Sequence, residues 1–263
     1  MKSSIIIPVH NQVEYTRLCI ESIIKNSNDT DYEIIVINNG STDATEHYLK
    51  EVNVKVIYNK ENIGVAKAWN QGIKISNGSY IFIINNDIVV CKNWIRNLIE
   101  FYENNPNTGI VSPAIREGKL NYDFEMYSSK FINKMKKIKE EGIFACCMVI
   151  KKDRFEKVGL FSEEFEIGIG EDTDFYLKLK NFGYKSYITG CAFVHHFGSI
   201  TLNDIKKRNG NNFEIININK LYEKWNIKKD SYFKRKAKSF KKFIKNLITR
   251  IFYGYTLYSK SKN

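Results

Sequence analysis

The sequence predicts an α/β fold built on a central, mostly parallel β-sheet, and three observations support this prediction. Continuous apolar runs, typical of strands buried on both faces, occur at residues 4–9, 33–37 and 80–84. Segments with apolar residues at helical spacing, 14–26 and 65–75, alternate with these runs. Each run ends in amides, histidine or turn residues. Because alternating strands and helices form parallel sheets with right-handed crossovers, we expect a parallel order for these strands.

Further segments complete the first half of the chain. The turn at 39–43 contains Ser, Thr and Asp side chains that can cap the next helix, and another strand is predicted at 54–58. An Asn-Gly turn at 77–78 precedes the strand at 80–84. Ligands of parallel sheets bind outside the carboxyl ends of the strands. We therefore expect one crevice lined by the residues that follow the strands: His10, Asn11, Asn38, Asn39, Gly40, Asn59, Lys60, Asn85, Asn86 and Asp87.

The second half of the chain is less regular. Residues 113–141 are polar and show no clear period. An apolar strand is predicted at 142–150, a helix at 174–182, and a strand at 187–194 that ends in a histidine pair. An α/β half followed by a mixed half predicts one domain made of two joined lobes.

The composition favours a protein with a substantial core and reduced thiols. Hydrophobic residues make up 43% of the 263 residues, which excludes wholesale disorder. The five cysteines form no CxxC pair and are odd in number, which argues against a disulfide framework or a zinc knuckle. The apolar run near the N-terminus is too short for a signal peptide, and no stretch approaches the ~18 apolar residues of a spanning helix. We therefore expect a cytoplasmic protein.

The formal net charge of +12 is concentrated in the C-terminal tail. Residues 228–263 contain 12 Lys or Arg and one acid, whereas the rest of the chain carries 29 bases and 28 acids. A basic amphipathic helix is typical of a segment that binds an anionic membrane surface, and a helix packed on the main domain is the alternative. No nucleic-acid-binding motif accompanies the charge, so we expect no nucleic-acid partner. The apolar residues at helical steps are Phe233, Ala237, Phe240, Ile244, Leu247, Ile251 and Tyr255.

Three polar groups follow apolar segments and are candidates for chemistry: residues 85–87, 171–174 and 195–196. Carboxylate and imidazole groups bind Mg²⁺ or Mn²⁺ when phosphates supply further oxygens, and a carboxylate without a metal can act as a general base. Each group alone also fits a structural role, namely a turn, a helix cap after the Gly-containing segment 167–170, or a buried histidine. The common phosphate-binding patterns GxxxxGKS and GxGxxG do not occur.

The order of these segments resembles that of the family 2 glycosyltransferases, which are inverting enzymes of the GT-A fold. The resemblance extends over about residues 3–203. Six motifs carry it: SIIIPVHNQ at 4–12, VINNGSTDAT at 36–45, NKENIGVAKAWNQGI at 59–73, YIFIINNDI at 80–88, EDTDFYLKLKNFGY at 171–184 and VHHFGS at 194–199.

The resemblance implies a catalytic domain at 1–203, with a nucleotide-sugar half at about 1–87 and an acceptor half at 88–203, and a basic, helical extension at 204–263. Many relatives have acids where this chain has Asn38 and Asn39, and an amide at these positions can still both donate and accept hydrogen bonds. The residues that the resemblance assigns to the nucleotide are Pro8, Val9, His10, Asn11, Asn39, Asn62, Lys67 and Asn86.

The same resemblance implies a divalent metal ion, Mn²⁺ or Mg²⁺, held by Asp87 and His196, with His195 as the alternative to His196. The segment Asn85-Asn86-Asp87 stands where the family has its DxD motif, and only its last position is acidic. A metal there offsets charge on the leaving diphosphate.

On the acceptor side, the resemblance implies that Asp172 is the general base of an inverting displacement. It would take the proton of the acceptor hydroxyl as that oxygen attacks the anomeric carbon. No carboxylate nucleophile is needed, unlike in the retaining glycosidases. Glu171 and Asp174 are expected to position the acceptor.

We therefore expect a metal-dependent, inverting glycosyltransferase that moves a sugar from a UDP- or dTDP-linked donor to an acceptor hydroxyl in bacterial surface polysaccharide or glycoconjugate synthesis. A saccharide or lipid-linked saccharide acceptor fits a peripheral position on the inner face of the cell membrane. One alternative, motivated by the reduced Asn-Asn-Asp motif, is a non-catalytic nucleotide-sugar-binding or scaffold protein. Another is a nucleotidyltransferase, against which the segment Glu171-Asp172 argues.

Overall fold

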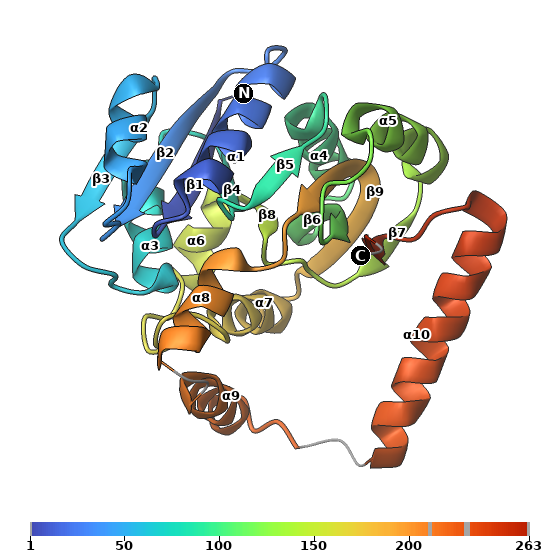
Figure 1. Ribbon diagram of the computed structural model, residues 1–263. Coiled ribbons are helices and arrows are strands. Elements are labelled where there is room, and N and C mark those ends of the chain that lie inside the picture. Colours follow the sequence, from blue (N-terminus) through green and yellow to red (C-terminus); the bar gives the residue numbers. More distant parts are fainter. Residues whose placement is uncertain (1, 210–211, 229–231, 262–263) are drawn as a thin grey trace.

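A mixed β-sheet forms the centre of the computed structural model, which describes residues 2–209, 212–228 and 232–261 (Figure 1). The strands follow the order β3-β2-β1-β4-β8-β6-β9-β5. The first four strands along the chain pair in parallel, which confirms the predicted parallel half. They are β1 (Ser3–Val9), β2 (Tyr32–Asn39), β3 (Lys55–Asn59) and β4 (Tyr80–Ile84).

Helices cover both faces of the sheet, and strand β1 shows what this requires of the sequence. Ile5 and Ile7 belong to one hydrophobic cluster, and Ile6 belongs to the other. Successive side chains of a strand point to opposite faces, so a strand covered on both sides is apolar throughout. The first cluster includes residues of α1 (Val13–Asn26), α2 (Thr45–Glu51), α4 (Trp94–Glu103) and α5 (Phe124–Met135), and the second includes residues of α3 (Val65–Ile75), α6 (Lys152–Val158) and α7 (Glu171–Asn181).

The second half of the sheet is mixed, as predicted, and it joins the first half where β4 pairs antiparallel with β8 (Cys147–Lys151). Strand β6 (Thr108–Glu117) pairs in parallel with β9 (Lys185–His196), and β5 (Ile88–Val90) pairs antiparallel with β9. The pairing of β5 with β9 brings the turn after β4 next to the histidine pair, because Ile88 lies opposite His196.

Several element boundaries differ from the sequence predictions. The segment 113–141, for which no period was found, contains the end of β6, the whole of α5 and the short strand β7 (Lys139–Glu141). Helix α5 begins at a local cap, since the Asp123 carboxylate accepts a hydrogen bond from Met126 N at 2.9 Å. The strand predicted at 142–150 begins only at Cys147, and the helix predicted from residue 174 begins at Glu171.

The C-terminal extension leaves the main body and returns to it (Figure 1). The predicted basic helix is present as α10, and the predicted domain boundary at residue 203 falls within α8. The sequence did not predict the last strand, which pairs in parallel with β6 so that Tyr258 lies opposite Ile115. The elements of the extension are α8 (Ile200–Asn209), α9 (Asn212–Lys224), α10 (Tyr232–Tyr253) and β10 (Tyr258–Lys260).

Helix α10 stands at one side of the molecule, away from the sheet (Figure 1). Its Lys245 forms an ion pair with Glu140 at 2.9 Å. Large apolar side chains on α10 are exposed, by 64% for Phe240 and 79% for Phe252. The side chains of Phe233 and Ala237, which belong to the predicted apolar stripe, lie outside the described ones. Within the described ranges, no helix is both long enough and apolar enough to cross a bilayer.

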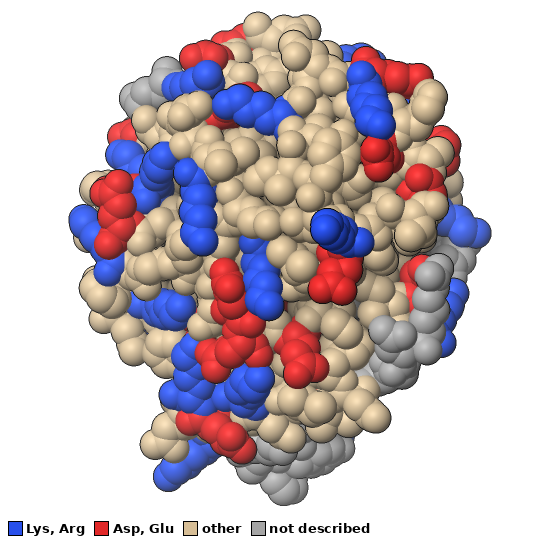
Figure 2. All heavy atoms as spheres, turned by 90° about the vertical axis from the view of Figure 1, so that its left-hand side faces the viewer, with Lys and Arg blue, Asp and Glu red and all other residues tan. Residues whose placement is uncertain are grey.

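The surface of the main body carries both signs of charge. Figure 2 shows basic and acidic side chains interspersed on the face that lies at the left of Figure 1. This mixture agrees with the near balance of 29 bases and 28 acids outside residues 228–263. The excess positive charge of the chain therefore belongs to the tail.

All five cysteines are free thiols, and four of them are buried. Burial raises the pKa of Cys91 to about 12, and it also raises the pKa of Cys146. Thiols with raised pKa values are poor nucleophiles, so these side chains act as small apolar groups in the core.

Candidate active site

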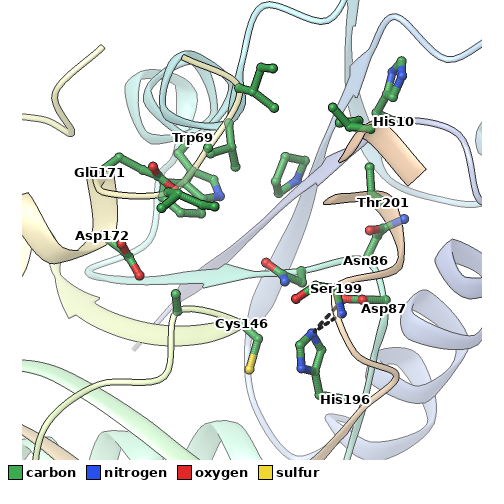
Figure 3. A pocket seen from close by; sticks show the side chains of 18 of the residues that line it. His10, Trp69, Asn86, Asp87, Cys146, Glu171, Asp172, His196, Ser199 and Thr201 are labelled. Carbon is green, nitrogen blue, oxygen red and sulfur yellow. Dashed lines mark hydrogen bonds and ion pairs between the residues drawn. The ribbon is translucent and has the colours of Figure 1, made fainter. Parts of the chain in front are cut away.

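A cavity of about 420 Å³ lies at the carboxyl ends of the parallel strands, where the sequence predicted a crevice (Figure 3). Three residues that the sequence analysis assigned to the site, Asn11, Lys67 and Asp174, are not part of its lining. The assigned residues that do line it are Pro8, Val9, His10, Asn39, Asn62, Asn86, Asp87, Glu171, Asp172 and His196.

Asn39 connects the loops on the predicted nucleotide side of the cavity, which is lined by His10, Asn39 and Asn62. Its Nδ2 donates to Asn62 Oδ1 at 2.8 Å, and its Oδ1 accepts from Asn59 Nδ2 and from Ile63 N, both at 3.1 Å. His10 Nδ1 lies 2.9 Å from the Asn39 carbonyl oxygen and donates to it. An acid at position 39 has no proton to donate to Asn62. Many relatives have an acid at this position. The amide has a structural reason here, because its N–H group holds Asn62.

Asn11 holds the loop after β1 to the turn after β2. Its Oδ1 accepts from Thr42 N at 2.7 Å, and its own N–H donates to Ser41 Oγ at 2.8 Å. The turn also needs Gly40, which has φ +72°, because a Cβ there would lie 2.5 Å from the backbone of Glu61. Asn11 thus supports the nucleotide side from outside the cavity, while Lys67 is an exposed residue of α3.

Asp87 and His196 meet at the other end of the cavity. Asp87, in the turn between β4 and β5, is 2% exposed, and its Oδ1 lies 3.3 Å from His196 Nε2. Its Oδ2 accepts from Ile200 N at 3.0 Å. Burial acts to raise the pKa of Asp87, but the hydrogen bond and charge of His196 outweigh it, so the pKa is lowered. Asp87 in turn raises the pKa of His196, although burial alone would lower it.

The strand geometry distinguishes the two adjacent histidines. His196 lines the cavity, whereas His195 points to the opposite face of β9, as successive strand residues do. His195 is fully buried, and its Nδ1 lies 3.0 Å from Tyr122 Oη. Burial lowers the pKa of His195 to about 4. His196 is therefore the histidine that can act in the site.

The chemistry of Asp87 and His196 fits a divalent cation. The Asp87 carboxylate and the His196 imidazole are buried side by side, with Oδ1 3.3 Å from Nε2, so an oxygen and a nitrogen atom are available to one ion. Oxygen and imidazole ligands suit Mn²⁺ or Mg²⁺. Nowhere in the described part of the chain do three or more His, Cys, Asp or Glu side chains form a metal-binding group. Further ligands would have to come from phosphate oxygens or water.

Glu171 and Asp172 begin helix α7 at the opposite side of the cavity (Figure 3). Asp172 Oδ1 accepts from Thr173 N at 2.7 Å, and Glu171 Oε2 is buried with no hydrogen-bond partner among the described residues. Burial, with the charge of Asp172 as the second cause, raises the pKa of Glu171 to about 8. Burial also raises the pKa of Asp172. Carboxyl groups with raised pKa values in a cavity are suited to proton transfer near neutral pH.

The loop that precedes these acids has an unusual backbone. Ile167 and Ile169 have φ values of +63° and +79°, and Gly170, just before α7, has φ +111°. Positive φ is uncommon for a β-branched residue and costs on the order of 1–3 kcal/mol per residue. Ile167, Gly168 and Ile169 line the cavity, so this strained backbone forms part of its wall.

Asp174 has a structural environment, although the resemblance placed it on the acceptor side. It is fully buried, and its Oδ1 accepts from Trp225 Nε1 at 2.9 Å and lies 2.8 Å from Lys224 Nζ. Its Oδ2 lies 3.2 Å from Lys178 Nζ. These contacts join α7 to the end of α9, away from the cavity.

Sequence reasoning missed several residues that line the cavity. Trp69, within the motif of residues 59–73, was not assigned a role, and its Nε1 is buried without a hydrogen-bond partner among the described residues. Glu117 ends strand β6 and accepts from Tyr258 Oη at 2.9 Å. Tyr258 and Ile205 come from the C-terminal extension. Only the unassigned tryptophan in a matching motif offered a signal in the sequence.

Known proteins resemble this chain in sequence over part of their length. Minor teichoic acid biosynthesis protein GgaB of Bacillus subtilis is 29% identical over 177 residues, which cover 63% of this chain and 20% of that protein. An uncharacterized glycosyltransferase of Rickettsia typhi is 30% identical over 176 residues, which cover 62% of this chain and 54% of that protein. The match thus spans a fifth of the first relative and about half of the second.

Solved structures resemble the fold. GalNAc-T7 with UDP, GalNAc and Mn²⁺ has a TM-score of 0.62 at 18% identity and covers 74% of this chain and 44% of that chain. Staphylococcus aureus TarS 1–349 has a TM-score of 0.55 at 18% identity, with coverages of 73% and 60%. The mannosyltransferase PcManGT from Pyrobaculum calidifontis, in complex with GDP-Man and Mn²⁺, has a TM-score of 0.56 at 17% identity, with coverages of 74% and 56%. At these identities the likeness shows the fold alone.

The fold of these structures is the GT-A fold, which confirms the predicted fold class. The sequence model described as Glycosyl transferase family 2 matches residues 4–159, which is more than half of the 263 residues. This chain therefore belongs to glycosyl transferase family 2.

Proposed function

We propose that this chain transfers a sugar from a nucleotide-diphosphate sugar to an acceptor hydroxyl, with inversion at the anomeric carbon. The observation that carries the proposal is the arrangement of one cavity: Asp87 and His196 lie at one side, and Glu171 and Asp172 lie at the other (Figure 3). An inverting displacement needs its base and its leaving group on opposite faces of the sugar. Family membership and the GT-A fold agree with this reaction.

On the donor side, the strand ends would bind the nucleotide. His10, Asn39 and Asn62 line the cavity and are fixed by their mutual hydrogen bonds, which makes them suitable to orient a base and ribose. Asp87 and His196 would hold a divalent metal ion together with the diphosphate. When bound, the ion would offset the charge that develops on the leaving nucleoside diphosphate.

On the acceptor side, Asp172 would be the general base. Its carboxylate faces the cavity and would accept the proton of the attacking hydroxyl. The raised pKa of Glu171 keeps that neighbour protonated near neutral pH, so Glu171 can donate a hydrogen bond to a sugar oxygen while Asp172 carries the charge. This division of roles gives each acid of the pair one function.

We further propose a UDP- or dTDP-linked donor and an acceptor in the synthesis of a surface polysaccharide or glycoconjugate. GalNAc-T7 was solved with UDP and Mn²⁺, whereas PcManGT was solved with GDP-Man, so the fold accommodates more than one nucleotide. The name of GgaB links one relative to teichoic acid, a cell-surface polymer. A saccharide or lipid-linked saccharide is the acceptor that fits this setting.

The donor and the reaction can be tested together. Thermal-shift measurements with UDP-, dTDP- and GDP-sugars, with and without Mn²⁺, identify the donor, and release of nucleoside diphosphate in the presence of saccharide acceptors then measures transfer. We expect one class of nucleotide-sugar to stabilise the protein only when Mn²⁺ is present. Addition of the acceptor should then release the nucleoside diphosphate. The product, analysed by NMR, should have an inverted anomeric configuration. Metal-dependent nucleotide binding without release would instead favour the non-catalytic alternative, which the reduced Asn-Asn-Asp motif at residues 85–87 motivates.

We also propose that helix α10 binds an anionic membrane surface on the cytoplasmic side. Supporting observations are its exposed apolar side chains, including Phe243 at 60% and Ile251 at 70%, next to exposed Lys241 and Lys242. Apolar burial and attraction of basic residues, on the order of 1 kcal/mol each, both favour such a surface.

Vesicle sedimentation tests this surface. The wild-type protein should sediment with vesicles containing phosphatidylglycerol and remain in solution with phosphatidylcholine alone. Replacing Lys241, Lys242 and Arg250 by Gln should weaken the binding, whereas the same change at Lys74, Lys157 and Lys180 of the main body should not. Equal loss in both variants would show a general charge effect and contradict a role of α10.

A further inference from the structure

The loop before the acid pair is held by a helix of the C-terminal extension. Asn217, on α9, is fully buried, and its Nδ2 donates to the carbonyl oxygen of Glu166 at 2.8 Å and to that of Gly168 at 3.0 Å. Its Oδ1 accepts from Glu166 N at 3.3 Å. One side-chain amide thus uses both of its protons and its oxygen on backbone groups of the same short segment.

These hydrogen bonds bracket a residue with a strained backbone. Ile167, at φ +63°, lies between the two residues that Asn217 contacts. Val65 N, at the start of α3, also donates to the Ile167 carbonyl oxygen at 3.1 Å. A non-glycine residue keeps such a conformation only where its surroundings hold it. Asn217 and Val65 therefore fix the loop from two helices, one of them in the extension.

A second group of contacts fixes α9 itself. Lys224 forms an ion pair with Asp174 at 2.8 Å, and Trp225 Nε1 donates to the same carboxylate. Lys220 Nζ donates to the Glu164 carbonyl oxygen at 2.6 Å. Helix α9 is therefore joined both to the loop and to the first turn of α7, where the acid pair lies (Figure 1). It lies outside the residues 4–159 that match the family.

We propose that Asn217 is a positioning residue for the transfer reaction: it fixes the backbone at 166–168 so that Glu171 and Asp172 face the acceptor side of the cavity. The inference rests on the proposed function. Ile167, Gly168 and Ile169 line the cavity together with the acids that follow them. If Ile167 relaxed to negative φ, the chain direction at Gly168 would change, and the start of α7 would move with it. A displacement of about 1 Å at a reacting group is enough to slow catalysis roughly 100-fold.

The test replaces Asn217 by Leu, which has a similar volume and no hydrogen-bonding group, and by Asp. The Asp variant keeps the acceptor for Glu166 N but turns a carboxylate oxygen toward two carbonyl oxygens. Asn219→Ala is the matched control, since Asn219 is an exposed residue on the same helix. For each protein, kcat, the donor KM and the nucleotide dissociation constant are measured at a temperature well below its Tm.

We expect Asn217→Leu to lower kcat by roughly 10- to 100-fold while the donor KM and nucleotide affinity stay within about twofold of wild type. Asn217→Asp should not restore kcat, and Asn219→Ala should behave as wild type. A residue with only a structural role would lower Tm and leave the kcat of the folded protein unchanged. Wild-type kcat in folded Asn217→Leu protein would therefore overturn the proposal.

Hydrogen exchange provides a readout that does not depend on activity. Amides in residues 161–174 should exchange faster in Asn217→Leu than in wild type, while amides in 80–90 should exchange at unchanged rates. If the wild-type protein transferred no sugar, the proposed function would fail, and the exchange data would still show whether Asn217 orders the loop. Unchanged exchange at 161–174 would overturn the inference whatever the activity.

Discussion

On the predicted nucleotide side of the cavity, the Asn39 amide both donates and accepts hydrogen bonds and joins the end of β2 to the loop between β3 and α3. On the acid side, Glu171 Oε2 is buried without a hydrogen-bond partner among the described residues, and the loop before it contains two isoleucines at positive φ. One wall of the cavity therefore has an amide that is satisfied locally, whereas the other has a buried carboxyl oxygen without a partner among the described residues.

This difference shows how stability and reactivity are distributed in the site. A buried polar group without a partner costs about 1–3 kcal/mol, and a buried carboxyl group responds by retaining its proton. The nucleotide side thus contributes to the stability of the fold, whereas the acid side reduces it and gains carboxyl groups with raised pKa values. Substitutions on the two sides should therefore affect stability and transfer differently.

The largest expected effect is that of Asp172→Asn. The amide keeps the shape of the carboxylate and cannot take the proton of the acceptor, so transfer should fall by roughly 10²- to 10⁴-fold. Nucleotide affinity, measured by calorimetry with Mn²⁺, should remain at the wild-type value because Asp172 lies across the cavity from Asp87. Retained turnover would contradict the assignment of the base.

Removing a proposed metal ligand should have the next largest effect. Asp87→Ala should weaken Mn²⁺-dependent binding of the nucleotide by on the order of 10- to 100-fold, because the remaining protein ligand is His196. The control is the same titration in EDTA, where the variant and the wild type should bind nucleotide with similar weak affinity. Equal Mn²⁺ dependence in both proteins would contradict a role of Asp87 as ligand.

On the nucleotide side, Asn39→Asp should mainly lower stability. The carboxylate cannot donate to Asn62 Oδ1, which also accepts from Gly64 N at 3.0 Å, so Asn62 cannot reverse its amide without losing that bond. We expect a loss of about 1–3 kcal/mol, seen as a Tm lower by several degrees. Asn53→Asp, at an exposed position, is the control and should change Tm little.

On the acid side, Glu171→Gln should have the opposite effect on stability. The pKa of Glu171 is raised to about 8 in the folded protein and returns to about 4.3 on unfolding. The folded state holds this proton more tightly, so wild-type stability falls as the pH rises from the unfolded pKa through the folded pKa. The Gln variant does not titrate, so it should gain stability relative to wild type over this window and not below it.

The gain in Tm should be absent near pH 4 and should grow with pH up to the folded pKa of Glu171. Transfer should decrease in the same variant. Thermal melts of Glu171→Gln, wild type and the exposed-site control Glu156→Gln between pH 4 and pH 8.5 measure the effect. A Tm difference that does not depend on pH would show that the pKa of Glu171 is not raised.

The parts of the structure that the sequence predicted well are those with a local pattern. Strands β1, β2 and β4 are continuous apolar runs because helices cover both faces, and their ends carry the polar residues that line the cavity. Strand β10 has only three residues and no period, so it was missed. Asp174 lies two residues after the acid pair and was grouped with it, although its partners include Lys224 and Trp225.

The amino-acid sequence by itself determined the parallel half of the sheet, the basic helical tail and the family, because each rests on residues that are close together or on motifs in a fixed order. The tertiary structure decided which histidine faces the cavity, because two adjacent residues of a strand differ only in the face that each meets. It also decided that the C-terminal extension contributes to the site, through contacts such as Asn217 with Glu166, 51 residues apart, and Tyr258 with Glu117, 141 residues apart. Such pairs leave no local pattern, since they form only when packing of the whole chain brings them together.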